Sequence, residues 1–570
     1  DDPHGSYSGS SFVVFGKTGT TAVELSNIEN GSGGFAVHGI NTNDVSGYSV
    51  STAADVNGDG FADLIIGAHT DDPNGSNSGN SFVVFGKTNG ITVELSDIDS
   101  GIGGFVIHGA SANDVSGYSV SNAGDVNGDG LSDLIIGARD DDPNGEKSGA
   151  SFVVFGQTNT NSIELSNVEA GTGGFVINGV SANDYSGVWV QDAGDVNGDG
   201  LADLIIGASS DDPNGSDSGG SFVVFGKTNN TSVELSNVEN GTGGFSINGV
   251  SSGDDSGRSV SSAGDVNGDG LDDLLVGARF DDPNGSDSGA AFVIYGKTNG
   301  TTVELSNIEN GTGGFVINGV SNGDHAGFPV SRAGDVNGDG FDDLIIGAYR
   351  DDPNGSNSGA SFVIFGTTNH TAVELSNIEN GSGGFVINGV SKDDYSGRSV
   401  SNAGDVNGDG LDDLIIGAKG DDPNGLDSGA SFVVFGKTNG TAIELSNVEA
   451  GTGGFVINGV SANDVSGVSV SNAGDINGDG LDDLIIGARL DDPNGSYSGA
   501  SFVVYGQTNT TTIELSNVEN GTGGFVINGI SINDYSGQSV SGAGDVNGDG
   551  FDDLIIGAPQ DDPNGSKSGV

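Results

Sequence analysis

The chain has 570 residues and a formal net charge of −64 at pH 7, from 80 acidic and 16 basic residues. Such a charge disfavours contact with nucleic acid or with an anionic membrane, so we expect no nucleic-acid partner and no membrane insertion. Cysteine is absent, which excludes a disulfide frame and a thiolate metal site.

A period of 70 residues organises the whole sequence. A regular period predicts one repeat architecture, here a single domain over residues 1–570, rather than several unrelated domains. The clearest repeated unit is Asp-(Val/Ile)-Asn-Gly-Asp-Gly-x-x-Asp, which begins at Asp55, Asp125, Asp195, Asp265, Asp335, Asp405, Asp475 and Asp545.

One full repeat predicts four strands in chain order, over residues 117–125, 133–138, 151–156 and 175–180. Four strands per repeat are typical of a β-propeller blade. Residues 163–168 alternate apolar and polar side chains and are either an extra edge strand or a packed loop. No apolar stripe of period 3.6 persists, so we expect no helix.

The two ends of the sequence complement each other. Residues 11–40 correspond to strands three and four of a repeat, and residues 537–558 correspond to strands one and two. We therefore predict an all-β, eight-bladed propeller of four-stranded, 70-residue blades, closed by a blade that the N- and C-terminal strands share. The alternative is a window of a longer array.

Each Asp-rich unit has the pattern of a calcium loop. Side chains at loop positions 1, 3, 5 and 9 and the backbone carbonyl at position 7 supply hard oxygen ligands, and a glycine permits the sharp turn. The expected ligands are Asp55, Asn57, Asp59, Phe61, Asp63, Asp125, Asn127, Asp129, Leu131, Asp133, Asp195, Asn197, Asp199, Leu201, Asp203, Asp265, Asn267, Asp269, Leu271, Asp273, Asp335, Asn337, Asp339, Phe341, Asp343, Asp405, Asn407, Asp409, Leu411, Asp413, Asp475, Asn477, Asp479, Leu481, Asp483, Asp545, Asn547, Asp549, Phe551 and Asp553.

These loops predict about eight Ca²⁺ ions, one per blade, with a structural role, because equivalent sites on every blade resemble staples. The alternative is an Asp- and Asn-rich turn without metal. Low-affinity calcium modules are extracellular, so we expect an extracellular or cell-surface protein whose targeting signal lies outside this segment. The nearby Asp-Asp-Pro-Asn-Gly motif is either a tight turn or a source of ligands for a second set of cations.

The positions at which the repeats differ indicate a ligand surface. They lie at the start of strand one and just after strand two, and the hairpin brings both to the rim opposite the calcium loops. Six of the seven arginines occupy these positions. The candidate surface is formed by Trp189, Arg258, Arg279, Phe280, His325, Phe328, Arg332, Tyr349, Arg350 and Arg398. The alternative is that each arginine pairs with the aspartate doublet that follows it, as Arg279 would with Asp281 or Asp282.

The blade pattern resembles a known family. Phe85-Gly86, followed by Gly-x-Ser-Val-x-x-Ala-Gly-Asp-Val-Asn-Gly-Asp-Gly-x-x-Asp-Leu-Ile-Ile-Gly-Ala, is similar to the FG-GAP repeat of integrin α-subunit propellers and their bacterial relatives. The chain departs from integrins in having eight repeats instead of seven blades, and a calcium loop in each. The resemblance implies an extracellular, calcium-stabilised interaction module.

Three functional classes fit these observations. The first is an adhesion module that binds an extracellular protein or an acidic polysaccharide through the rim, with Arg suited to both. The second is a scaffold that self-associates in a surface layer or filament. The third, a polysaccharide lyase, would need a unique catalytic base beside a cation. The near-identical blades show no such constellation, so we expect no enzymatic activity.

Overall fold

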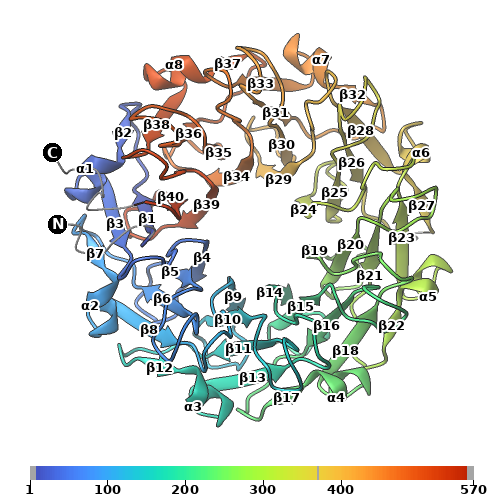
Figure 1. Ribbon diagram of the computed structural model, residues 1–570. Helices are drawn as coiled ribbons and strands as arrows, with labels where there is room; N and C mark the ends of the chain where they lie inside the picture. The colour runs from blue at the N-terminus through green and yellow to red at the C-terminus, as the bar shows by residue number, and fades with distance from the viewer. Residues whose placement is uncertain (1–7, 369–370, 562–570) are drawn as a thin grey trace.

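The computed structural model describes residues 8–368 and 371–561. In this part of the chain the strands form eight sheets, arranged as the blades of a closed ring (Figure 1). The prediction of an all-β, eight-bladed propeller is confirmed.

The first strand of each blade lies innermost and contacts the first strands of both neighbouring blades (Figure 1). Small polar residues dominate these strands, as expected for a wall that faces the centre of the ring. The first strands are β4 (Ser49–Ala54), β9 (Ser119–Gly124), β14 (Trp189–Gly194), β19 (Ser259–Gly264), β24 (Val330–Gly334), β29 (Ser399–Gly404), β34 (Ser469–Gly474) and β39 (Ser539–Gly544).

The second strand is buried along its whole length, which explains its continuous apolar sequence Leu-Ile-Ile-Gly-Ala. It pairs antiparallel with the first and third strands. The second strands are β5 (Asp63–Ala68), β10 (Asp133–Ala138), β15 (Asp203–Ala208), β20 (Asp273–Ala278), β25 (Asp343–Ala348), β30 (Asp413–Ala418), β35 (Asp483–Ala488) and β40 (Asp553–Ala558).

The third and fourth strands complete each blade as a second antiparallel pair. The third strands are β1 (Ser10–Val14), β6 (Asn80–Val84), β11 (Ala150–Val154), β16 (Gly220–Val224), β21 (Ala290–Ile294), β26 (Ala360–Ile364), β31 (Ala430–Val434) and β36 (Ala500–Val504). The fourth strands are β3 (Gly34–His38), β8 (Gly104–His108), β13 (Gly174–Asn178), β18 (Gly244–Asn248), β23 (Gly314–Asn318), β28 (Gly384–Asn388), β33 (Gly454–Asn458) and β38 (Gly524–Asn528).

A fifth, two-residue strand joins adjacent blades. It pairs parallel with the fourth strand of the preceding blade, as β12 does with β8. The segment at residues 163–168 therefore begins as an edge strand, one of the two predicted possibilities. The fifth strands are β2 (Val23–Glu24), β7 (Val93–Glu94), β12 (Ile163–Glu164), β17 (Val233–Glu234), β22 (Val303–Glu304), β27 (Val373–Glu374), β32 (Ile443–Glu444) and β37 (Ile513–Glu514).

The expectation of no helix is wrong, because a short helix follows each fifth strand. Its two buried side chains, Leu165 and Val168 in the third copy, point to the core. A helix this short has only two core-facing side chains, so the sequence shows no apolar stripe of period 3.6. The helices are α1 (Leu25–Glu29), α2 (Leu95–Asp99), α3 (Leu165–Glu169), α4 (Leu235–Glu239), α5 (Leu305–Glu309), α6 (Leu375–Ile378), α7 (Leu445–Glu449) and α8 (Leu515–Glu519).

One blade is assembled from both ends of the chain, as predicted. Its sheet has the order β39-β40-β1-β3-β7, and β1 pairs antiparallel with β40, with Phe12 opposite Ile556. This pairing leaves neither β1 nor β40 as an exposed sheet edge.

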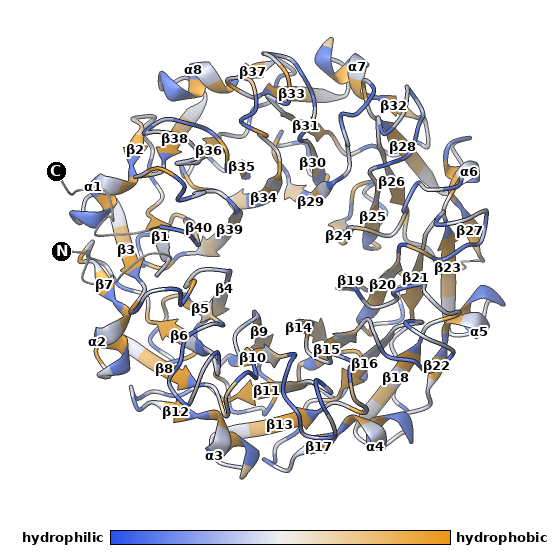
Figure 2. Ribbon diagram, in the orientation of Figure 1, coloured by the Kyte–Doolittle hydropathy of each residue, from blue (hydrophilic) through white to orange (hydrophobic). Residues whose placement is uncertain are grey.

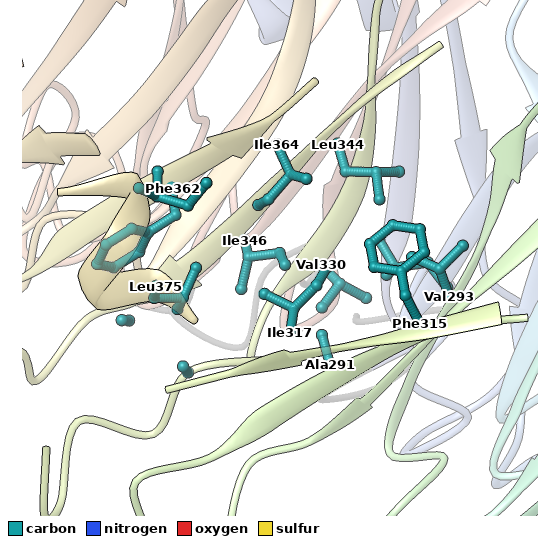
Figure 3. Packing of buried hydrophobic residues seen from close by; sticks show 14 of the residues in the cluster. Ala291, Val293, Phe315, Ile317, Val330, Leu344, Ile346, Phe362, Ile364 and Leu375 are labelled. Atoms are coloured by element: carbon teal, nitrogen blue, oxygen red, sulfur yellow. The ribbon is translucent and has the colours of Figure 1, made fainter. Parts of the chain in front are cut away.

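The hydrophobic core lies between adjacent blades rather than inside one. Apolar residues follow the strands, and polar residues follow the connections (Figure 2). In one such cluster, Val293, Phe315 and Ile317 of one blade pack against Ile346 and Phe362 of the next (Figure 3). Each blade therefore covers the faces of its neighbours, and the hydrophobic packing passes from one blade to the next.

Candidate calcium loops and arginine rim

Each Asp-rich loop closes the hairpin between the first and second strands of a blade. In the loop that begins at Asp125, the Asp125 carboxylate accepts hydrogen bonds from the backbone N–H groups of Gly128 at 2.7 Å, Asp129 at 3.1 Å and Gly130 at 2.9 Å. Gly128 and Gly130 have φ values of 78° and 88°, which favour glycine. The Asn-Gly-Asp-Gly segment therefore folds around the first carboxylate of the loop.

The last aspartate of the loop is completely buried. Asp133 accepts hydrogen bonds from the backbone N–H of Gly156 at 2.9 Å and from the side-chain amide of Asn127 at 3.1 Å. Burial, together with the nearby charges of Asp129 and Asp125, raises the pKa of Asp133 to about 7. The same causes raise the pKa to about 7 or 8 in the equivalent residues Asp63, Asp203, Asp273, Asp343, Asp413, Asp483 and Asp553.

The donor set of the loop fits calcium. Three carboxylates, one amide and one backbone carbonyl are all hard oxygen donors. No lysine or arginine of the described residues pairs with Asp125, Asp129 or Asp133, so the mutual repulsion of these carboxylates is not offset by a basic side chain. In the conformation shown, no three His, Asp or Glu side chains among residues 8–368 and 371–561 converge closely enough to hold a metal ion. Binding would therefore require the loop carboxylates to turn toward a shared ion.

Neighbouring loops are joined around part of the ring. The backbone N–H of Asp195 donates to Oδ2 of Asp272, in the loop of the next blade, at 2.8 Å. Equivalent bonds start from Asp265, Asp335, Asp405 and Asp475. An ordered loop thus helps to position the loop beside it.

The Asp-Asp-Pro-Asn-Gly motif forms a turn after the second strand and buries its first carboxylate. Oδ1 of Asp211 accepts a hydrogen bond from the backbone N–H of Asp212 at 3.0 Å, whereas its buried Oδ2 has no hydrogen-bond partner. Burial raises the pKa of Asp211 to about 7, with further contributions from Asp184 and Glu239. The Oδ2 atom is likewise unpartnered in the equivalent residues Asp281, Asp351, Asp421 and Asp491.

In the blade that contains Asp71, a side chain of the same blade supplies the hydrogen bond that Oδ2 of Asp211 lacks. The amide of Asn80 donates to Oδ2 of Asp71. His108 Nδ1 lies 3.0 Å from the oxygen of that amide, and its Nε2 lies 3.4 Å from Asp99. Alanine or glycine replaces Asn80, and asparagine replaces His108, in the blades with the unpartnered aspartates.

The structure brings eight of the ten residues of the predicted ligand surface together at the ends of three consecutive blades. The rings of Phe280 and His325 lie 5.2 Å apart, and those of His325 and Tyr349 lie 5.9 Å apart. The guanidinium of Arg279 lies 4.4 Å from the ring centre of Phe280 and 5.1 Å from that of Phe328. We name the group the arginine rim: Arg258, Arg279, Phe280, His325, Phe328, Tyr349, Arg350 and Arg398.

Two further arginines complete this packing. The Arg398 guanidinium lies 5.1 Å from the ring centre of Phe328 and 5.6 Å from that of Tyr349. Arg350 lies 5.5 Å from the ring centre of Tyr349, and its Nη1 lies 3.5 Å from Nε2 of His325. Burial and the charge of Arg350 lower the pKa of His325, so this histidine stays neutral near pH 7.

The charge of the rim is only partly compensated. Arg258 and Arg279 share Asp255, at 3.8 Å and 3.3 Å. Arg279 therefore does not pair with the doublet that follows it. Within the described chain, Arg350 and Arg398 form no ion pair with a carboxylate, so the rim presents positive charge on a strongly acidic molecule.

The other two predicted surface residues lie apart from the rim. Arg332 pairs with Asp342 at 2.6 Å, because its position opposite Leu344 in the hairpin places it near the calcium loop. Trp189 lies at the start of β14, in a pocket that it shares with Tyr48 and Tyr118.

A model of the FG-GAP repeat matches the chain eight times, over residues 46–84, 116–154, 192–225, 256–294, 331–364, 396–434, 466–504 and 536–570. Each match includes an Asp-rich loop and the second strand, and together the matches cover just over half of the sequence. The chain is an FG-GAP repeat protein. The resemblance of its blades to those of integrin α subunits is confirmed by relatives of that family.

Curated relatives of this FG-GAP protein include integrins and an enzyme. It is 30% identical to integrin alpha-PS2 of Drosophila melanogaster over 249 residues, 43% of this chain and 16% of the relative. It is 31% identical to integrin alpha-5 of Xenopus laevis over 169 residues, 29% of this chain and 15% of the relative. It is 30% identical to phosphatidylinositol-glycan-specific phospholipase D of Dictyostelium discoideum over 185 residues, 31% of this chain and 19% of the relative. The chain thus spans less than a fifth of each relative.

The sequence pattern does not group two sets of side chains that the fold brings together. The first is Asp211 with Asp184 and Glu239. The motif that contains Asp211 is offered by the sequence as a turn or a cation site, but the other two acids approach it only through contacts between distant segments. The second comprises Tyr48 and Tyr118, which vary between repeats but become a group only when adjacent inner strands meet. The sequence signal for the pocket of these tyrosines is Trp189, because serine or proline occupies its position in every other repeat.

Among the residues that the structure describes, no helix combines the length and the apolar composition that crossing a membrane requires.

Proposed function

We propose that this FG-GAP propeller is an extracellular or cell-surface adhesion module, stabilised by about eight Ca²⁺ ions, that binds an acidic glycan or an acidic protein segment through the arginine rim. Membership of the FG-GAP family and similarity to integrin α subunits support a binding role. The specific ligand surface is inferred from the rim alone.

Calcium would be held by the oxygen donors of each loop. In the second loop these are the side chains of Asp125, Asn127, Asp129 and Asp133 and the backbone carbonyl of Leu131. A bound ion supplies positive charge that offsets the repulsion between the carboxylates. The loop residues themselves fix the turn and, in five blades, position the neighbouring loop.

The uncompensated guanidinium groups carry the ligand proposal. Arg350 and Arg398 are held against Tyr349, so less side-chain freedom is lost when they bind. A guanidinium binds carboxylate or sulfate oxygens through two parallel hydrogen bonds. The rim thus suits an anionic partner, although the molecule as a whole repels anions.

We propose a binding role rather than catalysis for this surface. Arginines stacked on aromatic rings supply fixed positive charge, and an arginine stays protonated at neutral pH. The phospholipase D relative matches over 19% of its length, so its activity is not transferred to this chain.

Binding of soluble protein to immobilised dextran sulfate, with uncharged dextran as a reference, tests the rim. We expect saturable binding to dextran sulfate that weakens with added salt, because exposed charges are screened. The double substitution Arg350→Ala and Arg398→Ala should weaken it at least about tenfold, as expected for the loss of two charge-assisted contacts.

The double substitution Arg332→Ala and Arg489→Ala is the matched control, because it also removes two arginines, both outside the rim, and leaves Arg350 and Arg398 in place. Equal loss of binding in this control would show that net charge alone, and not the rim, holds the anion. Calcium-dependent self-association that is unaffected by both sets of substitutions would instead support a scaffold role.

A further inference from the structure

The inner wall of the ring contains a pocket away from the calcium loops and outside the arginine rim. Its volume is about 400 Å³, within the range of roughly 300–1,000 Å³ that is usual for small-molecule sites. It extends over the first residues of three adjacent inner strands and reaches a fourth strand at Ser539. The lining side chains include Tyr48, Tyr118 and Trp189, one from each of three consecutive blades.

The aromatic side chains of the pocket are partly exposed. Trp189 is 49% exposed and Tyr48 is 45% exposed, although most large apolar residues of the described chain are buried. An aromatic side chain held at the surface leaves one ring face available for a ligand.

Two side chains that do not line the pocket, His69 and Arg139, pack against the two tyrosines. Tyr48 and Tyr118 lie 5.4 Å apart, and the ring of His69 lies 4.5 Å from Tyr48 and 5.6 Å from Tyr118. The guanidinium of Arg139 lies 3.8 Å from the ring centre of Tyr118. Burial and Arg139 lower the pKa of His69 to about 4, and burial and Tyr118 raise the pKa of Tyr48 to about 12. His69 is therefore uncharged and Tyr48 keeps its hydroxyl proton near pH 7, so the charge of these two side chains does not change across neutral pH.

The pocket lining carries no charged side chain, in a protein whose net charge is −64. Its polar side-chain groups are serine hydroxyls, the amide of Gln191 and the hydroxyls of Tyr48 and Tyr118. Ser49 and Ser119 accept hydrogen bonds from the backbone N–H groups of Val120 and Val190, at 3.2 Å and 3.3 Å, which fixes their positions. Their hydroxyl protons are available to a ligand. The lining thus combines exposed aromatic faces with neutral hydrogen-bonding groups.

The pocket is built by departures from the repeat. Six of the seven equivalent positions to Trp189 hold serine and one holds proline, and glutamine replaces serine at position 191 alone. The scaffold therefore tolerates serine at this position, and tryptophan adds a large ring face to the pocket.

We propose that this pocket binds a short neutral carbohydrate chain. A sugar ring has an apolar C–H face that suits Tyr and Trp rings, and an edge of hydroxyl groups that suits serine and glutamine. A charged ligand would find no ion-pair partner on the wall, and a wholly apolar ligand would leave the serine hydroxyls unsatisfied. None of the eight rim residues lines this pocket, so its ligand and that of the rim are tested with different substitutions.

The experiment uses Trp189 as its own reporter, because it is the only tryptophan of the chain. Calcium-loaded protein is titrated with the neutral hexasaccharides of the cello, xylo, manno and N-acetylchito series, and tryptophan fluorescence and heat of binding are recorded. We expect a saturable change with at least one series. Tyr48→Val, which introduces the residue found at equivalent positions Val188 and Val468, should weaken that binding about tenfold.

Trp189→Ser restores the residue of six other blades, so it should keep the melting temperature and abolish the heat of binding. Leu426→Ser, in an exposed turn of another blade, is the control that should leave binding unchanged. The double substitution at Arg350 and Arg398 should also leave it unchanged, whatever its effect on dextran sulfate. The proposal fails if no neutral hexasaccharide gives a saturable signal, or if Trp189→Ser or Tyr48→Val binds as tightly as the unaltered protein.

Discussion

A single carboxylate oxygen shows how residue-level environments differ between nearly identical repeats. Oδ2 of Asp211 is buried without a partner, whereas Oδ2 of Asp71 accepts a hydrogen bond from Asn80. The pKa of Asp211 is raised to about 7, so the folded state binds this proton more tightly than the unfolded state. The stabilisation by this proton is complete below the ordinary pKa, near 3.8, and is lost as pH rises through about 7.

Asp211→Asn should therefore raise the free energy of unfolding at pH 8 by about 1–3 kcal/mol, the usual cost of an unsatisfied buried polar group, and by less at pH 5. Thermal and urea unfolding at both pH values, at one calcium concentration, measure this difference. Asp71→Asn is the matched control and should stabilise less, because burial also raises the pKa of Asp71 but the amide of Asn80 donates to its carboxylate. A loss of stability in Asp211→Asn at pH 8 would contradict this account, because it would mean that the folded protein uses the negative charge.

The site residues were predictable from the sequence to different degrees. The Asp-rich loops and their turns were predictable because all the candidate donors lie within nine consecutive residues, and calcium binding at these loops stays a prediction. The rim was partly predictable because varied residues stand out in a repeat, but the position of Arg332 depends on the register of its hairpin. The partner of Arg279 lies in an earlier turn of the chain, at Asp255, and only the folded hairpin brings them together.

At the scale of elements, the fifth strand connects each blade to the one before it. Glu234, in β17, accepts hydrogen bonds from Asn178 at 2.8 Å and from Asn144 at 3.2 Å. The corresponding Glu164, in β12, accepts from Asn74 at 3.0 Å, and His108 occupies the place of the second asparagine. The asparagine of the Asp-Asp-Pro-Asn-Gly turn thus ties two blades together.

Glu234→Ala should lower the free energy of unfolding by about 1–3 kcal/mol, because two amide donors lose a charged acceptor. Glu164→Ala should cost less, since only one such bond is removed. Urea unfolding of the two variants, followed by circular dichroism, gives the comparison. Equal costs would show that these side chains do not secure the blade edge.

The four main strands followed from local patterns, but the short helix and the fifth strand did not. Alternating and continuous apolar runs, bounded by glycine, identify strands that pair with sequence neighbours. The fifth strand has only two residues and pairs with another blade, so no local pattern reveals its partner. Its helix is one turn long and buries only two side chains, Leu165 and Val168.

For the whole molecule, the pairing of β1 with β40 closes the ring. β1 and β40 pair along five residues, from Ser10 opposite Ala558 to Val14 opposite Leu554, which completes the eighth blade. The loops then lie at equivalent places around the ring, and hydrogen bonds join several of them. Calcium at these loops would offset carboxylate charge that opposes the compact state of the apo protein.

Calcium titration by calorimetry on chelator-stripped protein, with thermal unfolding of the same samples, tests the central claim most directly. We predict about eight bound equivalents and a large rise in melting temperature, since each independent site adds roughly 2.7 kcal/mol at a hundredfold excess of free calcium over Kd. Far fewer equivalents, or binding without stabilisation, would contradict the assignment of the eight loops as structural calcium sites.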